Sequence, residues 1–179
     1  MSAPSGKQAD IRYGGRDSVT GGGERDDWRT PPTLMADIYD RFKLDFDPCP
    51  YPRPKWWDGL KGDWHGRAFV NPPYGKETGA WIQKALGELI AGRIEIAVFL
   101  IHARTDTRWF QDLVLERAEE LYFIRGRVAF VGPDGRGEPS PFPSLIAVLK
   151  PYVPTGFPKA RSWVTRDPAQ TKLEADACG

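Results

Sequence analysis

The stretch Ile-Glu-Ile-Ala-Val-Phe-Leu-Ile at residues 94–101 is the most strand-like segment of the chain. It is apolar apart from Glu95 and rich in β-branched residues, which predicts a strand buried on both faces of a sheet. A helical pattern precedes it, with apolar residues on one face: Trp81, Ile82, Ala85, Leu86, Leu89 and Ile90. Residues 67–70 predict another strand before that helix. A strand, a helix and a strand in succession predict the start of an open, parallel α/β sheet.

The same kinds of pattern continue on both sides of this unit. Upstream, five apolar residues have helical spacing: Leu34, Met35, Ile38, Tyr39 and Phe42. Residues 44–46 then predict a short strand. Downstream, the pattern predicts one helix and three strands, at residues 107–118, 121–124, 128–131 and 145–149. We therefore expect a single-domain α/β fold of three layers, with a mostly parallel sheet and antiparallel edge strands.

The folded domain is expected to span residues 26–158. Residues 1–25 are rich in glycine and poor in aliphatic side chains, so they bury too little apolar surface to offset the entropy lost on ordering. They predict a disordered N-terminal tail. Residues 159–179 are polar and predict a C-terminal tail, although Trp163 could pack back onto the domain.

Charge and hydropathy exclude several classes of protein. The 25 basic and 24 acidic residues give a net charge of +1, so contact with nucleic acid must come from a local basic patch. The longest apolar run, residues 96–101, is far shorter than the roughly 20 residues that cross a bilayer. Two cysteines, Cys49 and Cys178, form neither a disulfide framework nor a zinc cluster. We therefore expect a cytoplasmic protein with no membrane contact and no metal.

The most distinctive segment is Asn71-Pro72-Pro73-Tyr74, directly after the strand at residues 67–70. Ligands of open α/β sheets bind at the carboxyl ends of strands. The two prolines stiffen the segment and lack N–H groups, so it offers hydrogen-bond acceptors and few donors. The Asn71 side-chain oxygen and the Pro72 carbonyl can converge on an –NH2 group, while Tyr74 can stack on the ring that carries it.

This arrangement suits the alkylation of an aromatic amine. Such an amine is a poor nucleophile because its lone pair is delocalised into the ring. Two acceptors that hold both hydrogens favour a more tetrahedral nitrogen and free the lone pair for attack. Neither a metal nor a strong base is needed when the electrophile is already activated. The alternative interpretation is a rigid turn after a strand, since Asn-Pro pairs form turns.

Asn71-Pro72-Pro73-Tyr74 resembles motif IV of amino-methyltransferases that use S-adenosylmethionine (SAM). More of the chain resembles one family, the phage DNA N6-adenine methyltransferases related to Dam. The segments that carry this resemblance follow in order at residues 27–32, 46–50, 71–75, 103–110, 125–127 and 141–144. The resemblance implies a Rossmann-like, SAM-dependent fold. It also implies site-specific methylation of N6 of an adenine flipped out of DNA, in a bacterial or phage-infected cell.

The resemblance assigns roles to individual residues. Catalysis would fall to Asn71, Pro72, Pro73 and Tyr74. The methyl donor SAM would be held by six residues: Trp28, Thr30, Pro31, Asp47, Pro48 and Asp63. Asp47 would bind the methionine ammonium or the sugar, although Cys49-Pro50-Tyr51 stands where related enzymes often have a glycine-rich turn. Asp47 could instead form only an Asp-Pro turn, and Asp63 could be a surface residue.

DNA contacts are expected from residues near strand ends and turns: Arg104, Arg108, Arg125, Arg127 and Phe142. The arginines would meet phosphates, which supply most sequence-independent affinity. Arg125 and Arg127 flank Gly126, so an ordinary turn explains them equally well. Phe142 would either line the base pocket or simply pack.

Two alternative functions stay open at this point. The same pair of acceptors serves methyltransferases that act on RNA adenine or on protein glutamine. A non-catalytic DNA-binding module with a degenerate pocket is the second alternative, against which the intact segment at residues 71–74 argues.

Overall fold

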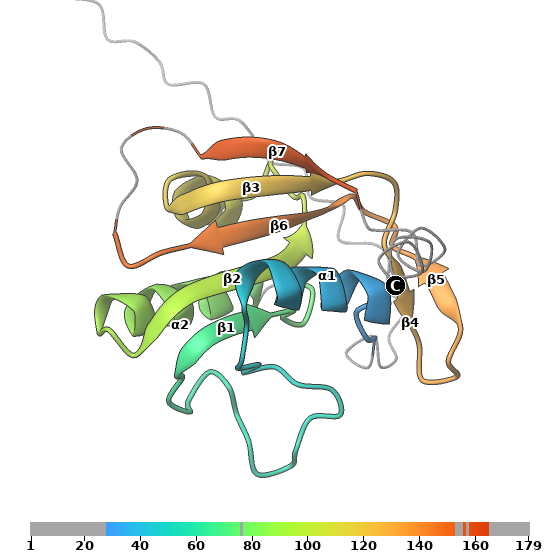
Figure 1. Ribbon diagram of the computed structural model, residues 1–179, viewed down its shortest axis with the longest axis horizontal. Coiled ribbons are helices and arrows are strands. Elements are labelled where there is room, and N and C mark those ends of the chain that lie inside the picture. Colours follow the sequence, from blue (N-terminus) through green and yellow to red (C-terminus); the bar gives the residue numbers. More distant parts are fainter. Residues whose placement is uncertain (1–27, 76, 153–155, 157, 165–179) are drawn as a thin grey trace, which may run out of the picture.

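The computed structural model describes residues 28–75, 77–152, 156 and 158–164. Its elements are α1 (Pro32–Phe42), β1 (Gly66–Val70), α2 (Thr78–Ile90), β2 (Ile94–His102), the π-helix η2 (Phe110–Leu115), β3 (Ala118–Ile124), β4 (Ala129–Val131), β5 (Gly137–Pro139), β6 (Ser144–Leu149) and β7 (Lys159–Trp163). A five-stranded sheet has the order β1-β2-β6-β3-β7, and β4 pairs with β5 in a separate small sheet (Figure 1). Within the described residues, no helix is both long enough and apolar enough to cross a membrane.

Four of the five strands in the main sheet point the same way. β1 is parallel to β2 and β3 is parallel to β7, whereas β6 runs antiparallel between β2 and β3. The mostly parallel α/β sheet predicted from the sequence is confirmed. The antiparallel strand, however, is internal rather than at an edge. All six residues of β6 are buried. An internal position suits such a strand, because a neighbouring strand on each side pairs its backbone and shields it from water.

Both faces of the main sheet are apolar and covered by helices, as a three-layer fold requires. Alternate residues of β2 point to opposite faces because side chains alternate along a strand. Val98 and Leu100 pack with α1 on one face, and Phe99 and Ile101 pack with α2 and η2 on the other. Every residue of β2 from 96 to 101 is therefore in the core.

Three segments differ from the sequence prediction. Residues 44–46 form only an isolated parallel bridge between Phe46 and Ala68. The helix expected at residues 107–118 is a short π-helix, and Ala118 already begins β3. β4 leaves the main sheet and pairs with β5 instead of continuing from β3.

The sheet also extends beyond the predicted boundary at residue 158. The five residues of β7 pair in parallel with β3, inside the segment expected to be a polar tail. Trp163 anchors this edge strand, because its buried indole stacks on Phe42 at 6.2 Å between ring centroids. The first four residues of β7 are exposed, which is why the segment lacks an apolar pattern. The predicted tail at residues 1–25 lies outside the described residues.

Candidate active site

Two chain segments end side by side at the carboxyl end of β1. Phe46 is bridged in parallel to Ala68 of β1, and Phe69 N donates a hydrogen bond to Phe46 O at 2.8 Å. Asp47 and Asn71 directly follow these paired segments. Because the segments are parallel, Asp47 and Asn71 come out at the same edge, where α/β folds bind their ligands.

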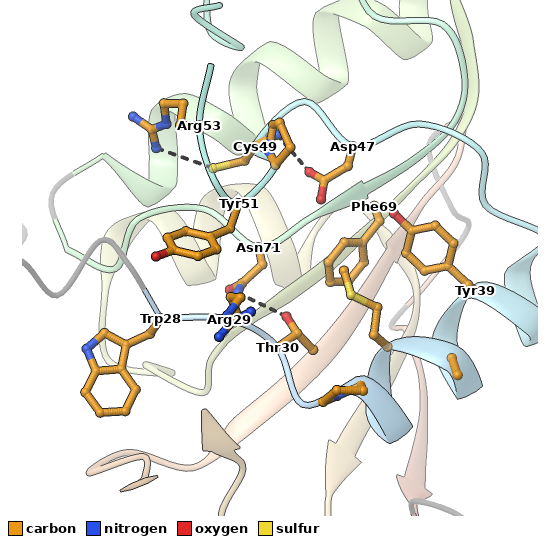
Figure 2. Close-up of a pocket in the computed structure, with 14 residues that line it drawn as sticks. Trp28, Arg29, Thr30, Tyr39, Asp47, Cys49, Tyr51, Arg53, Phe69 and Asn71 are labelled. Carbon is orange, nitrogen blue, oxygen red and sulfur yellow. Dashed lines mark hydrogen bonds between the residues drawn. The ribbon is translucent and has the colours of Figure 1, made fainter. Parts of the chain in front are cut away.

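A cavity of about 750 Å³ lies at this edge (Figure 2). Its volume is in the usual range of small-molecule sites. Three parts of the chain form most of its wall: the segment before α1, one face of α1 and the loop that follows Asp47. The lining residues named by the sequence prediction are Trp28, Thr30, Asp47 and Asn71. The structure thus brings together side chains that are up to 43 residues apart (71 − 28).

The segment before α1 is held in place by the small sheet. Arg29 and Val131 of β4 exchange two backbone hydrogen bonds of 2.9 Å each. Pro31 caps α1 and Pro32 begins it, positions that suit proline because the first turn of a helix leaves its N–H groups unpaired. Thr30 is consequently fixed and buried beside the cavity.

Asn71 presents an unpaired hydrogen-bond acceptor in the cavity wall. Its Nδ2 donates to Thr30 Oγ1 at 3.2 Å, a contact drawn in Figure 2. Its Oδ1 is buried and has no hydrogen-bond partner among the described residues. Leaving a buried polar atom unpaired costs about 1–3 kcal/mol. A ligand N–H group that reached this oxygen would remove that cost.

Asp47 is a half-buried carboxylate that also lines the cavity. Burial raises its pKa to about 6, and the hydrogen bond donated by Cys49 N at 2.8 Å offsets that rise only in part. Tyr39 of α1 also lines the cavity, and burial together with the negative charges of Asp47 and Asp45 raises its pKa to about 12. The cavity thus holds a carboxylate that a cationic ligand would stabilise and a phenol that stays protonated.

Tyr74 belongs to an aromatic stack and does not line this cavity. Its ring lies face to face with His102, with centroids 3.8 Å apart and planes 12° apart, and it meets the edge of Phe130 at 5.6 Å. Its hydroxyl is buried without a partner in the described part of the chain, and burial raises the Tyr74 pKa well above its ordinary value. One face of the ring expected to stack on a base is therefore covered by His102.

His102, which ends β2, is a packed and neutral side chain. Its Nε2 is 3.0 Å from Ser140 Oγ. Burial, with a smaller contribution from the positive charge of Arg104, lowers the His102 pKa to about 4. Phe142 continues the stack at 5.2 Å from His102, and the Arg104 guanidinium lies 5.0 Å from the Phe142 ring. The stack therefore links the Asn71–Tyr74 segment to an exposed aromatic and a cation.

Three residues predicted to bind the donor are not part of the cavity lining. Pro31 and Pro48 are beside it but do not line it, and the Pro48 carbonyl accepts a hydrogen bond from Trp57 Nε1 at 2.8 Å. Asp63 is exposed and lies within electrostatic reach of Arg93, which precedes β2. A residue just before a strand sits at its amino end, so Asp63 is at the opposite edge of the sheet from Asn71.

The remaining predicted DNA contacts are separate surface arginines. Arg125 and Arg127 are exposed on the turn between β3 and β4, where Gly126 has a positive φ of 79° and Arg125 N bonds to Trp163 O at 3.0 Å. Arg108 is exposed just before η2. None of these three contributes to the cavity lining.

Among the lining residues that sequence reasoning did not assign to the site, four carry a hydroxyl or a guanidinium group: Arg29, Tyr39, Tyr51 and Arg53. Tyr39 lies on an amphipathic helix, where an aromatic side chain normally indicates core packing. The other three occupy segments without periodicity. In those segments, the aromatic and basic composition around residues 51–53 was the one available signal.

A family model described as DNA N-6-adenine-methyltransferase (Dam) matches residues 17–170, a range that includes the whole main sheet and the cavity. The chain belongs to this family. The resemblance inferred from the sequence is thus confirmed, and with it the expectation of a phage-type adenine-N6 DNA methyltransferase. The alternatives of an RNA or protein methyltransferase and of a non-catalytic module are not favoured.

Individual members and solved structures give further similarities. A DNA N-6-adenine-methyltransferase of Haemophilus phage HP1 (strain HP1c1) is 25% identical over 151 residues, covering 76% of this Dam-family chain and 86% of that protein. The crystal structure of a predicted O-methyltransferase, protein Atu636 from Agrobacterium tumefaciens, is 14% identical with a TM-score of 0.32, covering 61% of this chain and 50% of that one.

Proposed function

We propose that this chain transfers the methyl group of S-adenosylmethionine to the exocyclic N6 amine of an adenine flipped out of DNA, at specific sites. The observation that carries the proposal is the unpaired Oδ1 of Asn71, buried in the wall of a ligand-sized cavity at the end of β1. An exocyclic amine supplies the donor that this oxygen lacks. A base inside a duplex cannot reach such a cavity without leaving the stack.

The cavity residues suit S-adenosylmethionine as the methyl donor. Asp47 would hold its ammonium group, since a buried carboxylate with a raised pKa is stabilised by a nearby cation. Trp28 and Thr30 would lie beside the methionine part, and Met35 and Phe69 give an apolar wall. When bound, S-adenosylmethionine supplies a methyl carbon activated by a sulfonium, which the amine takes as the carbon–sulfur bond breaks and its electron pair stays on sulfur.

The residues of the Asn71–Tyr74 segment would prepare the amine for this transfer. Asn71 Oδ1 accepts one hydrogen of the amine and the Pro72 carbonyl accepts the other, which frees the lone pair on nitrogen. Pro73 keeps the segment stiff, because two successive prolines restrict their own φ angles and the residues before them. The methylated nitrogen then releases a proton to water.

Tyr74 would stack on the flipped adenine, with His102 supporting its ring from one face. Around this pocket, Arg104, Arg108, Arg125 and Arg127 would contact phosphates, and Phe142 would lie at the edge of the base site. These contacts would place the DNA against the side of the sheet where the parallel strands have their carboxyl ends. The DNA would be that of a bacterial or phage-infected cell.

The test is the identity of the methylated product. The full chain is incubated with S-adenosylmethionine and unmethylated genomic DNA, and nucleosides are analysed by mass spectrometry. At equal incubation times, N6-methyladenine is expected with the wild type and at least about a hundredfold less of it with Asn71→Ala, while calorimetry shows donor binding by both. Methylated RNA adenine or protein glutamine beside unmodified DNA would overturn the proposal.

A further inference from the structure

The loop at residues 50–62, here called the Trp56 loop, borders the cavity and has no role in the proposal above. Figure 1 shows the chain between α1 and β1 projecting beyond the sheet on the side of the edge strand β1. Pro50, Tyr51 and Arg53 line the cavity on this side. A base that enters the cavity from DNA would therefore pass next to the Trp56 loop.

Two tryptophans fix the shape of this loop. Trp57 donates its Nε1–H to Pro48 O at 2.8 Å, and its ring lies so close to Gly62 that a Cβ there would be 2.5 Å away. Trp64 is buried and donates its Nε1–H to Gly59 O at 2.7 Å. The loop is thus held to the domain at Trp57 and Gly59 by the hydrogen bonds of two indole side chains.

Trp56 is placed in the opposite way. It is 83% exposed and touches Trp57 only edge-on, with ring centroids 6.1 Å apart. An indole is normally among the more buried side chains, because an exposed indole leaves a large apolar surface in contact with water. A loop that is anchored through the half-buried Trp57 and the buried Trp64 and that presents Trp56 outward is suited to binding a partner through the Trp56 ring.

The charge next to Trp56 indicates the kind of partner. The Trp56 loop carries three basic residues and one acidic residue, for a net charge of +2, whereas the whole chain has +1. Lys61 is paired with Asp58 at 3.0 Å. Among the described residues, no ion pair involves Arg53 or Lys55. Two cations without an ion pair among the described residues therefore directly precede an exposed aromatic ring, and the more distant charge of Asp58 acts on Arg53.

We propose that the Trp56 loop binds the DNA strand around the target adenine, a proposal that rests on the proposed function. Trp56 stacks on a base next to the flipped adenine, whose departure uncovers the faces of its neighbours. Arg53 and Lys55 contact the adjoining phosphates. Aromatic stacking combined with nearby cations is the general way in which proteins hold unpaired nucleotides. A protein partner would instead favour a continuous apolar patch over a single ring beside two cations.

The first test compares Trp56→Ala and Trp56→Phe with Ile90→Ala as a matched control. Ile90 is 71% exposed and ends α2, outside the cavity lining. Binding of unmethylated duplex DNA is titrated at fixed salt, and donor affinity and thermal unfolding are measured for each variant. We expect Trp56→Ala to weaken DNA binding about ten- to a hundredfold, Trp56→Phe to recover most of it and Ile90→Ala to have no effect. Donor affinity stays unchanged in all three.

The second test is the salt dependence of DNA binding. Lys55→Gln should reduce the slope of log affinity against log salt by about one, the effect of losing one phosphate contact. Wild-type affinity in Trp56→Ala and an unchanged slope in Lys55→Gln would overturn this proposal and leave the loop to a protein partner. If the wild type also methylates DNA in that case, the proposed function survives. A wild type that neither binds nor methylates DNA overturns both.

Discussion

The Nδ2 of Asn71 donates a hydrogen bond to Thr30 Oγ1 at 3.2 Å, joining the end of β1 to the segment before α1. This bond uses the donor side of the Asn71 amide and leaves the acceptor side, Oδ1, without a partner among the described residues. Thr30 is therefore a positioning residue. Its hydroxyl holds the nitrogen of the Asn71 amide and so leaves the amide oxygen free for a substrate amine. The two residues are 41 positions apart in the sequence (71 − 30).

Thr30→Val should slow methylation about tenfold at saturating substrates. Valine has nearly the same shape as threonine but accepts no hydrogen bond, and a lost bond of this kind is worth about 0.5–1.5 kcal/mol. Steady-state kinetics provide the measurement, with kcat separated from KM. Thr30→Ser keeps the hydroxyl and should restore the rate. A loss in Thr30→Ser with an unchanged rate in Thr30→Val would mean that the methyl group of Thr30 matters and the hydrogen bond does not.

Asn71→Ala should lower kcat by about two to three orders of magnitude, the usual effect of removing one group aimed at charge that develops in a transition state. Asn71→Asp keeps an acceptor oxygen at the same position, so it should retain more activity than Asn71→Ala. Calorimetry should give similar donor affinities for both variants. Equal activity in the two variants would contradict the role of Oδ1 as acceptor.

The strand–helix–strand unit around β2 could be predicted because its signals are local. The apolar run at residues 94–101 requires burial of both faces, and the helical spacing before it requires a crossover. The internal position of β6 could not be predicted. Burial of both faces is equally compatible with several strand orders, and no local pattern specifies the neighbours of a strand. β7 could not be predicted because Trp163 is the one buried residue among its five, so the segment has no apolar pattern.

The candidate site was partly predictable for a similar reason. Asp47 and Asn71 were identified because each carries unusual chemistry directly after a strand or bridge, and parallel neighbours bring such positions together. Asp63 was predicted for the same site because it is close to β1 in sequence. A residue that precedes a strand, however, lies at the amino end of that strand, opposite to Asn71. The stacking of Tyr74 on His102 depends on a tertiary contact between the ends of two strands, which sequence spacing does not encode.

Tyr74→Phe should stabilise the protein by about 1 kcal/mol, because it removes a buried hydroxyl that has no partner within the described residues. For a domain of this size, the melting temperature should rise by about 2–4 °C. Methylation should stay within a few-fold of wild type, since the ring that stacks is kept. Tyr74→Ala removes the ring and should lose both stability and activity. A lower melting temperature or an inactive Tyr74→Phe would show that the hydroxyl has a partner in the substrate complex.

Glu88 should make the fold sensitive to acid. Its side chain is 1% exposed and bonds to Arg93 Nε at 2.5 Å and to Lys84 Nζ at 2.6 Å, and the Arg93 bond is the main cause that lowers its pKa to about 2. Because the folded-state pKa is below the unfolded value, this contribution is complete above about pH 4.5 and is lost as the pH falls towards 2.

The measurement for Glu88 is urea unfolding of the wild type and Glu88→Gln across that range. The variant should be about 2–3 kcal/mol less stable at pH 7. The difference between the two proteins should shrink as the pH drops from 4.5 to 2. A difference that stays constant would mean that packing, and not charge, accounts for the effect of the substitution.

Asp47 should make donor binding depend on pH. Its pKa of about 6 in the free protein means that protonation near pH 6 removes the charge proposed to hold the ammonium group. Donor affinity should be constant above about pH 7 and should fall by up to about tenfold per unit below pH 6. Calorimetry between pH 5 and pH 8 measures this, and Asp47→Asn should bind weakly with no slope in the same range.

The same raised pKa predicts a cost in stability. The folded state holds the Asp47 proton more tightly than the unfolded chain, so stability falls as the pH rises from about 4 to above 6. Asp47→Asn should therefore be more stable than wild type at pH 8, by on the order of 2 kcal/mol, and equal to it near pH 4. A variant that binds the donor poorly and yet melts at a higher temperature would show that Asp47 is kept for binding at the expense of the fold. Loss of stability at pH 8 would instead make Asp47 a structural residue whose hydrogen bond to Cys49 N holds the loop.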